Sequence, residues 1–260
     1  MIDTHCHFDF PPFNDDPKRA LALAQEGGVN QIVIPTVGQS NWAKVQLLCQ
    51  RYPALYYGLG IHPFFSAEHT SDVCQRLHFE LKEALQQPYS KCVAVGECGL
   101  DFAIETLDRE LQQTWLQAQL QLANIYRLPI ILHCRKAFPE LVRAIRADTP
   151  SQGGVYHGFS GSYQQAVQLI DLGLKIGVGG TITYERAKKT RETIAKLPLS
   201  EIVLETDAPD MPVCGFQGQP NRPERIAYVM NTVASLKGIS IESVTEATTL
   251  TAHELFKIPS

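Results

Sequence analysis

Eight short apolar runs, rich in valine and isoleucine, alternate along this chain with longer amphipathic segments. Near-continuous apolar strands separated by helices are typical of a parallel sheet that is covered on both faces. Eight such units predict an α/β fold, a closed TIM (β/α)8 barrel with the strands at its centre and the helices outside them. The predicted strands are residues 2–5, 31–35, 55–62, 92–97, 129–133, 154–157, 174–178 and 201–205.

Two of the intervening segments have the spacing of helices. Between the fourth and fifth runs, apolar residues recur at intervals of four and three, which places them on one stripe of a helix. After the eighth run, Pro223 stands where a first helical turn tolerates proline, and Gly238 follows as a stop signal. The two stripes are Leu111, Trp115, Ala118, Leu122 and Ile125, and then Ile226, Val229, Val233 and Leu236.

The length and composition of the chain suit one large core. The chain has 260 residues and a hydrophobic content of 44%, and α/β barrels routinely run to ~200–250 residues without dividing. We therefore expect a single domain over residues 1–260, with a C-terminal helical segment at 240–256 outside the eightfold count.

Composition also bounds the partners and the location. The chain has no uninterrupted apolar stretch of about 18 residues and no signal-peptide pattern at its start, so we expect a cytoplasmic protein with no membrane contact. The seven cysteines are scattered without a CxxC pair, which is typical of reduced thiols rather than of a disulfide framework. A net charge of −4 provides no broad basic surface for nucleic acid, so any phosphate must be held locally. No obligate protein partner is evident.

Histidines and carboxylates stand at the carboxyl ends of the predicted strands, where the active site of an α/β barrel lies. His5 and His7 are two residues apart on the first strand, so both point to one face while Cys6 points to the other. Independent structural histidines would not be expected to gather at the same end of several strands. The later members of this set are His62, Glu97, His133, His157 and Asp207.

The set predicts a metal site. Without His62 it still holds four histidines and two carboxylates, more than the roughly three protein ligands that one catalytic zinc needs. It fits two divalent ions that share a carboxylate, and Glu97 on the fourth strand is placed to be the bridge. Two ions about 3.5–4 Å apart can hold a hydroxide and stabilise both the attacking and the leaving oxygen. The ligands leave the identity of the ions open among Zn²⁺, Mn²⁺ and Mg²⁺.

Six motifs, in order along essentially the whole chain, resemble those of the TatD-like metal-dependent hydrolases of the amidohydrolase superfamily. The resemblance implies a TIM barrel with a two-metal site and, for several members, a metal-dependent DNase activity that sometimes removes nucleotides from a 3′ end. The motifs are His5-Cys6-His7, Gly60-Ile61-His62-Pro63, Val95-Gly96-Glu97-Cys98-Gly99-Leu100-Asp101, Leu132-His133-Cys134-Arg135, His157-Gly158-Phe159-Ser160-Gly161 and Glu205-Thr206-Asp207-Ala208-Pro209.

The resemblance also implies how the ligands are divided. Related amidohydrolases bridge their metals with a carboxylated lysine on the fourth strand, and Glu97 resembles its replacement. The chain departs from the family pattern at Gly158, at Ala208 with Asp210, and at Thr251, without loss of a ligand. Gly158, Ala208 and Asp210 lie beside ligands, so these three departures bear on substrate preference. One implied ligand set is His5, His7, Glu97 and Asp207, and the other is Glu97, His133 and His157.

Further roles concern catalysis. Asp207 can accept the proton of the attacking water, a general-base task. Arg135 shares a strand face with His133, where its guanidinium either grips a substrate phosphate or forms an ion pair at the barrel rim. His62 either contacts a substrate phosphate or leaving group or packs the strand end, and Asp101 either caps its loop or supports a ligand. The candidate catalytic residues are therefore Asp207, His62 and Arg135.

Three functions are compatible with these residues. The first is a phosphodiesterase or deoxyribonuclease that acts on DNA ends or short nucleotide substrates through a hydroxide activated by two metals. The second is a hydrolase of a carboxylic ester, lactone or amide, because the same hydroxide attacks a carbonyl carbon equally well. The complete ligand set disfavours the third, a non-catalytic metal-binding partner protein, and the family motifs favour the first over the second.

Overall fold

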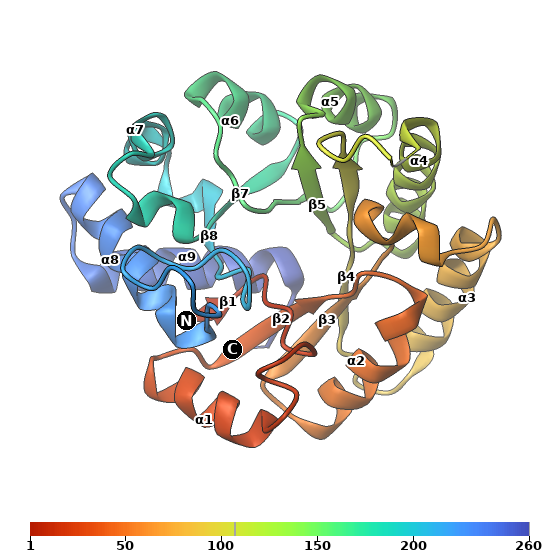
Figure 1. Ribbon diagram of the computed structural model, residues 1–260, viewed down its shortest axis with the longest axis horizontal. Helices are drawn as coiled ribbons and strands as arrows, with labels where there is room; N and C mark the ends of the chain where they lie inside the picture. The colour runs from red at the N-terminus through yellow and green to blue at the C-terminus, as the bar shows by residue number, and fades with distance from the viewer. Residues whose placement is uncertain (107, 260) are drawn as a thin grey trace. The chain divides into compact units, whose positions relative to one another are not determined.

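A computed structural model describes residues 1–106 and 108–259 of the chain. Eight strands follow one another in sequence order in a single sheet, and helices alternate with them (Figure 1). The backbone N–H of Thr4 donates to the carbonyl of Leu204 over 3.1 Å, which joins the last strand to the first. This strand order is that of a (β/α)8 barrel, so the predicted fold class is confirmed.

The chain divides into two compact units. The first consists of Met1–Ile34 and His157–Ser260, and the second of Pro35–Tyr156. The first unit holds the strands from both ends of the sequence, with the helices that follow them. Its elements are β1 (Ile2–Asp3), α1 (Pro17–Glu26), β2 (Gln31–Pro35), α6 (Tyr163–Ile170), β7 (Leu174–Val178), η2 (Gly180–Thr183), α7 (Lys188–Lys196), η3 (Leu199–Glu201), β8 (Ile202–Leu204), η4 (Pro223–Arg225), α8 (Ile226–Lys237) and α9 (Ile241–Phe256).

The second unit holds the middle of the chain. Its strands β3 to β6 pair in parallel with their neighbours in sequence order. Its elements are α2 (Gln39–Arg51), β3 (Leu55–Leu59), η1 (Pro63–Glu68), α3 (Val73–Gln86), β4 (Cys92–Asp101), α4 (Arg109–Tyr126), β5 (Ile130–Arg135), α5 (Phe138–Ala147) and β6 (Gly154–Tyr156).

The strands match the predicted apolar runs, and the differences lie at their ends. β1 stops at Asp3, although Cys6 still forms a parallel β-bridge with Ala208. β3 ends at Leu59, whereas the predicted run continued to residue 62. β4 instead continues past Glu97 and pairs with β5 as far as Asp101. The metal-type residues therefore stand both within strands and just after them.

Close approach of β4 to β5 depends on Gly99. Its φ is 148°, in the region that side-chain-bearing residues rarely adopt, and a Cβ here would overlap the carbonyl oxygen of His133. Only glycine allows this contact. The contact keeps the carboxyl-terminal half of β4, which follows Glu97, in register with the part of β5 that carries His133.

Helix boundaries follow local chemistry. Ser162 caps α6 through a reciprocal capping box with Gln165, and Asp108 accepts the first free N–H groups of α4. α8 ends, as predicted, at Gly238, whose φ is 64°. Within the described ranges, no helix has both the length and the apolar character that a membrane span needs.

The buried face of α4 is rotated relative to the predicted stripe. Trp115 and Leu122 are buried as expected, but Ile125 is 62% exposed. Two glutamines, Gln112 and Gln119, take places on the buried face instead. The helix packs against β4 (Figure 1), and its buried amides bond to the loops after the strands.

This orientation of α4 predicts unequal effects of truncating two apolar residues. Leu116 is fully buried, so Leu116→Ala leaves a cavity and should lower the free energy of unfolding by about 2–5 kcal/mol. Ile125→Ala should change it by no more than about 0.5 kcal/mol, because the side chain is largely in water. Urea unfolding of the two variants measures the difference. Equal destabilisation by both changes would contradict the orientation.

Candidate metal centre

His5 and His7, just after β1, face the carboxylate of Asp207, just after β8. The Oδ1 atom of Asp207 lies 3.5 Å from Nε2 of His5 and 3.7 Å from Nε2 of His7. The backbone N–H of Asp207 donates to the carbonyl of His5 over 2.8 Å, and its φ is 55°. Aspartate tolerates this left-handed conformation better than most residues, and such positions gather at functional sites.

A third histidine and a second carboxylate belong to the same unit. The ring of His157 stacks on that of His5 with centroids 3.9 Å apart. Oε1 of Glu205 accepts a hydrogen bond of 2.5 Å from the N–H of Gly158 and lies 3.8 Å from Nδ1 of His157. One potential metal-binding atom from each of His5, His157 and Glu205, a ring nitrogen or a carboxylate oxygen, lies within 4.8 Å of the other two. Glu205 is a candidate metal ligand that the sequence prediction did not include.

Burial governs the protonation of the carboxyl groups in this unit. It raises the pKa of Glu205 to about 8, against the opposing effects of His157 and the Gly158 N–H. It also raises the pKa of Asp3 to about 7, although Thr206 donates to both oxygens of Asp3. Removal from water favours the neutral acid, so each group gains from a nearby cation.

Asn221 holds the loop that carries Asp207. It is fully buried, and its side-chain amide donates to the carbonyls of Thr206 and Met211 over 2.8 and 3.1 Å. Its backbone N–H donates to the carbonyl of Pro209 over 2.7 Å. These three bonds bracket Asp207 on both sides and fix the direction of its carboxylate.

Glu97 is the centre of the cluster in the other unit. Nε2 of His62 lies 3.2 Å from Oε1 of Glu97, and Nδ1 of His133 lies 3.3 Å from the same oxygen. The Glu97 side chain is 2% exposed. Ligand-type atoms of the three residues lie within 4.8 Å of one another. His62 Nδ1 accepts from the N–H of Phe64, so its Nε2 carries the proton of the neutral ring.

Asp101 makes both of the contacts that the sequence left as alternatives, one that caps its own loop and one to the predicted ligand His133. Its Oδ1 accepts from the N–H of Ala103 over 2.9 Å, and its Oδ2 lies 3.4 Å from Nε2 of His133. Burial raises the pKa of Asp101, but the bonds from His133 and Ala103 and the charge of Arg135 outweigh it and lower the pKa. A carboxylate beside the far nitrogen of an imidazole orients the ring and raises its basicity toward a metal.

Two glutamines of α4 fasten the loops that carry this cluster. Gln119 accepts from the N–H of Ile61 over 2.7 Å and donates to the carbonyl of the same residue over 3.1 Å. Gln112 bonds the N–H and carbonyl of Asp101 over 2.7 and 3.2 Å. Each side-chain amide bonds a backbone N–H and carbonyl as a neighbouring strand would. Gln119 does so just after β3 and positions His62, and Gln112 does so at the end of β4 and positions Asp101.

Arg135 ends β5 and is exposed. Its guanidinium forms no salt bridge with any residue that the structure describes, and its charge contributes to the lowered pKa of Asp101. The adjacent Lys136 has a φ of 53°, which turns the chain sharply after the strand. Arg135 thus keeps a positive charge near His133 and Asp101.

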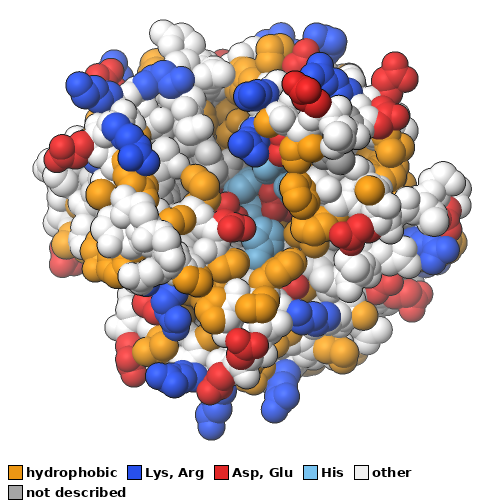
Figure 2. Space-filling model, in the orientation of Figure 1, with side chains coloured by type: hydrophobic (Ala, Val, Ile, Leu, Met, Phe, Trp, Pro, Cys, Tyr) orange, Lys and Arg blue, Asp and Glu red, His pale blue; other side chains and the backbone are white. Residues whose placement is uncertain are grey.

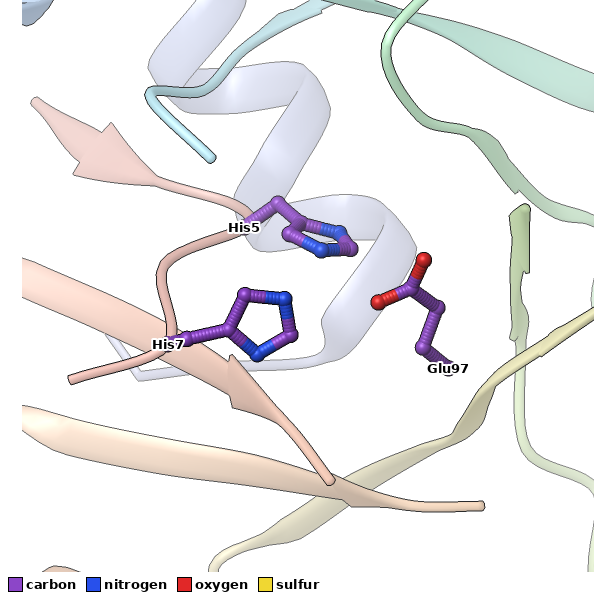
Figure 3. Close-up of side chains that lie close together, drawn as sticks. All are labelled: His5, His7 and Glu97. Carbon is purple, nitrogen blue, oxygen red and sulfur yellow. The ribbon is translucent and has the colours of Figure 1, made fainter. Parts of the chain in front are cut away.

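The predicted ligands fall into one cluster in each unit. Glu205 joins the first cluster and His62 the second, and neither was predicted as a ligand. Figure 3 draws His5 and His7, from the segment after β1, and Glu97, from β4. Figure 2 shows histidine side chains at the surface of the face that it displays. The donors are imidazole nitrogens and carboxylate oxygens, which suit divalent ions such as Zn²⁺ and Mn²⁺. The clusters are His5, His7, His157, Glu205 and Asp207, and His62, Glu97 and His133.

Imidazole and carboxylate clusters at the ends of barrel strands define a class, the metal-dependent hydrolases built on the (β/α)8 fold. The family model described as TatD related DNase matches residues 2–257, and the chain belongs to this family. It is a metal-dependent hydrolase of the TatD family.

Known relatives resemble the chain over its whole length. It is 47% identical to the uncharacterized metal-dependent hydrolase YjjV of Escherichia coli K12, over 100% of this chain and 98% of the relative. The crystal structure of YjjV, a TatD homolog, superposes with a TM-score of 0.94 at 46% identity and covers 100% of this chain and 98% of that one. The 3′-5′ ssDNA/RNA exonuclease TatD of Pantoea vagans is 27% identical, over 99% of this chain and 100% of the relative.

The bond between Gln119 and Ile61 predicts a cost for an apolar replacement. Gln119→Leu leaves a buried N–H and a buried carbonyl without partners, so it should lower the free energy of unfolding by about 1–3 kcal/mol per group. Gln113→Leu, on the exposed side of the same helix, is the matched control and should have little effect. Urea unfolding compares the two, and similar stabilities would contradict the role given to Gln119.

Proposed function

We propose that this metal-dependent hydrolase is a phosphodiesterase that shortens single-stranded DNA from its ends or cleaves short nucleotide substrates. The observation that carries the proposal is the buried Glu97 carboxylate. Ring nitrogens of His62 and His133 both lie close to its Oε1 atom. A relative of the same family bears the name of a 3′-5′ exonuclease on single-stranded DNA and RNA. Absence of disulfides among the seven cysteines agrees with a cytoplasmic location, which we propose as well.

We infer two divalent ions, Zn²⁺, Mn²⁺ or Mg²⁺, from the chemistry of the donors. When bound, such ions lower the pKa of water and neutralise charge on a phosphate. Glu97 is the carboxylate proposed to serve both. Beside it, His5, His7 and Asp207 would hold one ion, and His133 and His157 would hold the other.

The remaining proposed roles follow from the geometry of each unit. Asp207 is the general base, because its carboxylate is 16% exposed and can reach a water as well as the two histidines beside it. His62 offers an N–H from Nε2, which holds the Glu97 carboxylate and can donate to a phosphate oxygen. Arg135 supplies a positive charge for the substrate phosphate.

Metal removal tests the metalloenzyme proposal. Ligands that bind only the folded chain stabilise it by mass action, so chelation should lower the melting temperature and abolish hydrolysis. Activity and melting are measured before and after exhaustive chelation, with metal loss checked by elemental analysis. Restoring one metal at a time identifies the ion that supports turnover. Unchanged turnover in metal-free protein would refute the proposal.

The two carboxylates should differ when they are replaced. Asp207→Asn keeps the shape of the side chain and loses its basicity, so most bound metal should stay while turnover falls roughly 10²–10⁴-fold. Glu97→Ala removes the carboxylate that is proposed to hold both ions, so metal should be lost together with activity. Metal content and turnover are measured for each purified variant. Equal metal loss in both would contradict this division of roles.

Substrate class is tested with a labelled oligonucleotide, single- or double-stranded, beside a lactone and a carboxylic ester. Stepwise shortening of the single strand from one end, with a weak dependence on salt, is the expected result, because the net charge of −4 limits contact to a few phosphates. Cuts within a closed circle would contradict action at ends. Hydrolysis of the ester or lactone without any nuclease activity would favour the alternative function instead.

A further inference from the structure

A small pocket lies between the loops that follow β7 and β8. Its volume is about 240 Å³, which is below the roughly 300–1,000 Å³ of sites for drug-sized ligands and suits a single ring system. Both loops leave the carboxyl ends of their strands, the side on which barrel active sites lie. The lining residues are Thr181, Tyr184, Arg186, Ala187, Met211 and Pro212.

Hydrogen bonds hold the two walls of the pocket together. The Tyr184 hydroxyl donates to the carbonyl of Pro212 over 2.7 Å, and Thr183 accepts from the N–H of Cys214 over 2.8 Å. Gly180 packs so closely that a Cβ would lie 2.5 Å from the carbonyl oxygen of Met211. The pocket is therefore formed before a ligand arrives, which reduces the entropy lost on binding.

The pocket presents flat, polarizable surfaces and a positive charge. The guanidinium of Arg186 stacks on the Tyr184 ring at 4.5 Å from its centroid. Arg186 is exposed, and within the described residues it forms no salt bridge. Met211 is 42% exposed and has a φ of 50°, so its thioether is presented from a constrained backbone. Arginine planes, aromatic rings and thioethers are surfaces on which nucleobases stack.

The pocket and the site share a loop. Met211 follows Asp207 by four residues, in the stretch where the chain departs from the family pattern at Ala208 and Asp210. Asn221 bonds the carbonyls on either side of this stretch, at Thr206 and Met211. A group bound in the pocket is thus tied to the loop that carries the proposed base.

We propose that this pocket binds one nucleobase of the strand being cleaved, with Arg186 beside the neighbouring phosphate. The proposal rests on the proposed phosphodiesterase function. Stacking is open to every base because each has a π-face, so the pocket recognises a base without selecting its identity. The enzyme then distinguishes a nucleotide from a bare phosphodiester.

The test compares two single-stranded oligonucleotides of equal length and charge, one of which lacks the bases of its last few nucleotides at the cleaved end. For the unaltered protein we expect kcat/KM to be about tenfold higher on the complete strand, the order of effect of stacking one base. Arg186→Ala and Met211→Ala should each reduce this ratio toward one. Tyr184→Phe keeps the ring and loses only the bond from its hydroxyl to Pro212, so it should lower the ratio less than either of these changes.

Arg143→Ala is the matched control, because it removes one exposed positive charge on α5, outside the pocket. It should leave the ratio unchanged even if overall binding weakens. A ratio of one for the unaltered protein, or an unchanged ratio in both pocket variants, would overturn the pocket proposal and leave the nuclease function standing. Cleavage of neither strand, beside rapid hydrolysis of a lactone or ester, would overturn both.

Discussion

Removal of carboxylates from water is the constraint on which this structure depends. Asp3, Glu97 and Glu205 are all buried, and a buried charge without compensation costs several kcal/mol. Each is compensated by groups close to it in space, Asp3 by Thr206, Glu97 by His62 and His133, and Glu205 by the Gly158 N–H and His157. Burial still holds the pKa of Asp3 and Glu205 well above the ordinary range. A carboxyl group in this condition gains from a nearby cation, and the proposed metal ions would supply one.

The fold was predictable because the spacing of apolar residues along the sequence distinguishes strands from helices. The runs at 31–35 and 174–178 coincide with β2 and β7, since a strand between two layers of helices is apolar along its length. The predicted ends of β3 and β4 were wrong, and the reason is physical. They are fixed by bonds from Gln119 and Gln112, and Gln119 stands 58 residues from its partner Ile61. Sequence period carries no information about such distant polar pairs. It also placed Ile125 on the buried stripe of α4, whereas that side chain is exposed.

The sequence predicted which kinds of residue form the candidate site better than it predicted which of them contact one another. Histidines and acids at strand ends indicated a metal site, and the structure gathers His5, His7, His157 and Asp207 in one unit and Glu97 with His133 in the other. Glu205 was missed, although it stands only two residues before the predicted ligand Asp207, which is a usable signal. Asn221 carried no such signal. It lies in a turn-rich stretch, and only the folded loop shows that its amide brackets Asp207.

The candidate metal ligands and the proposed base pocket are supported by different groups. The ligand-bearing backbone is fastened by buried amides, whose loss leaves polar groups without partners. The tips of the loops after β7 and β8 are joined by bonds between main-chain carbonyls and exposed or half-buried side chains, as at Tyr184 and Pro212. Substitutions at Arg186 or Met211 alter the surface offered to a substrate without touching those amides. The candidate ligand Asp207 and the proposed base pocket thus share the loop after β8. Asn221 holds the backbone of this loop at Thr206 and Met211, while the exposed side chains of the pocket can be substituted without loss of these bonds.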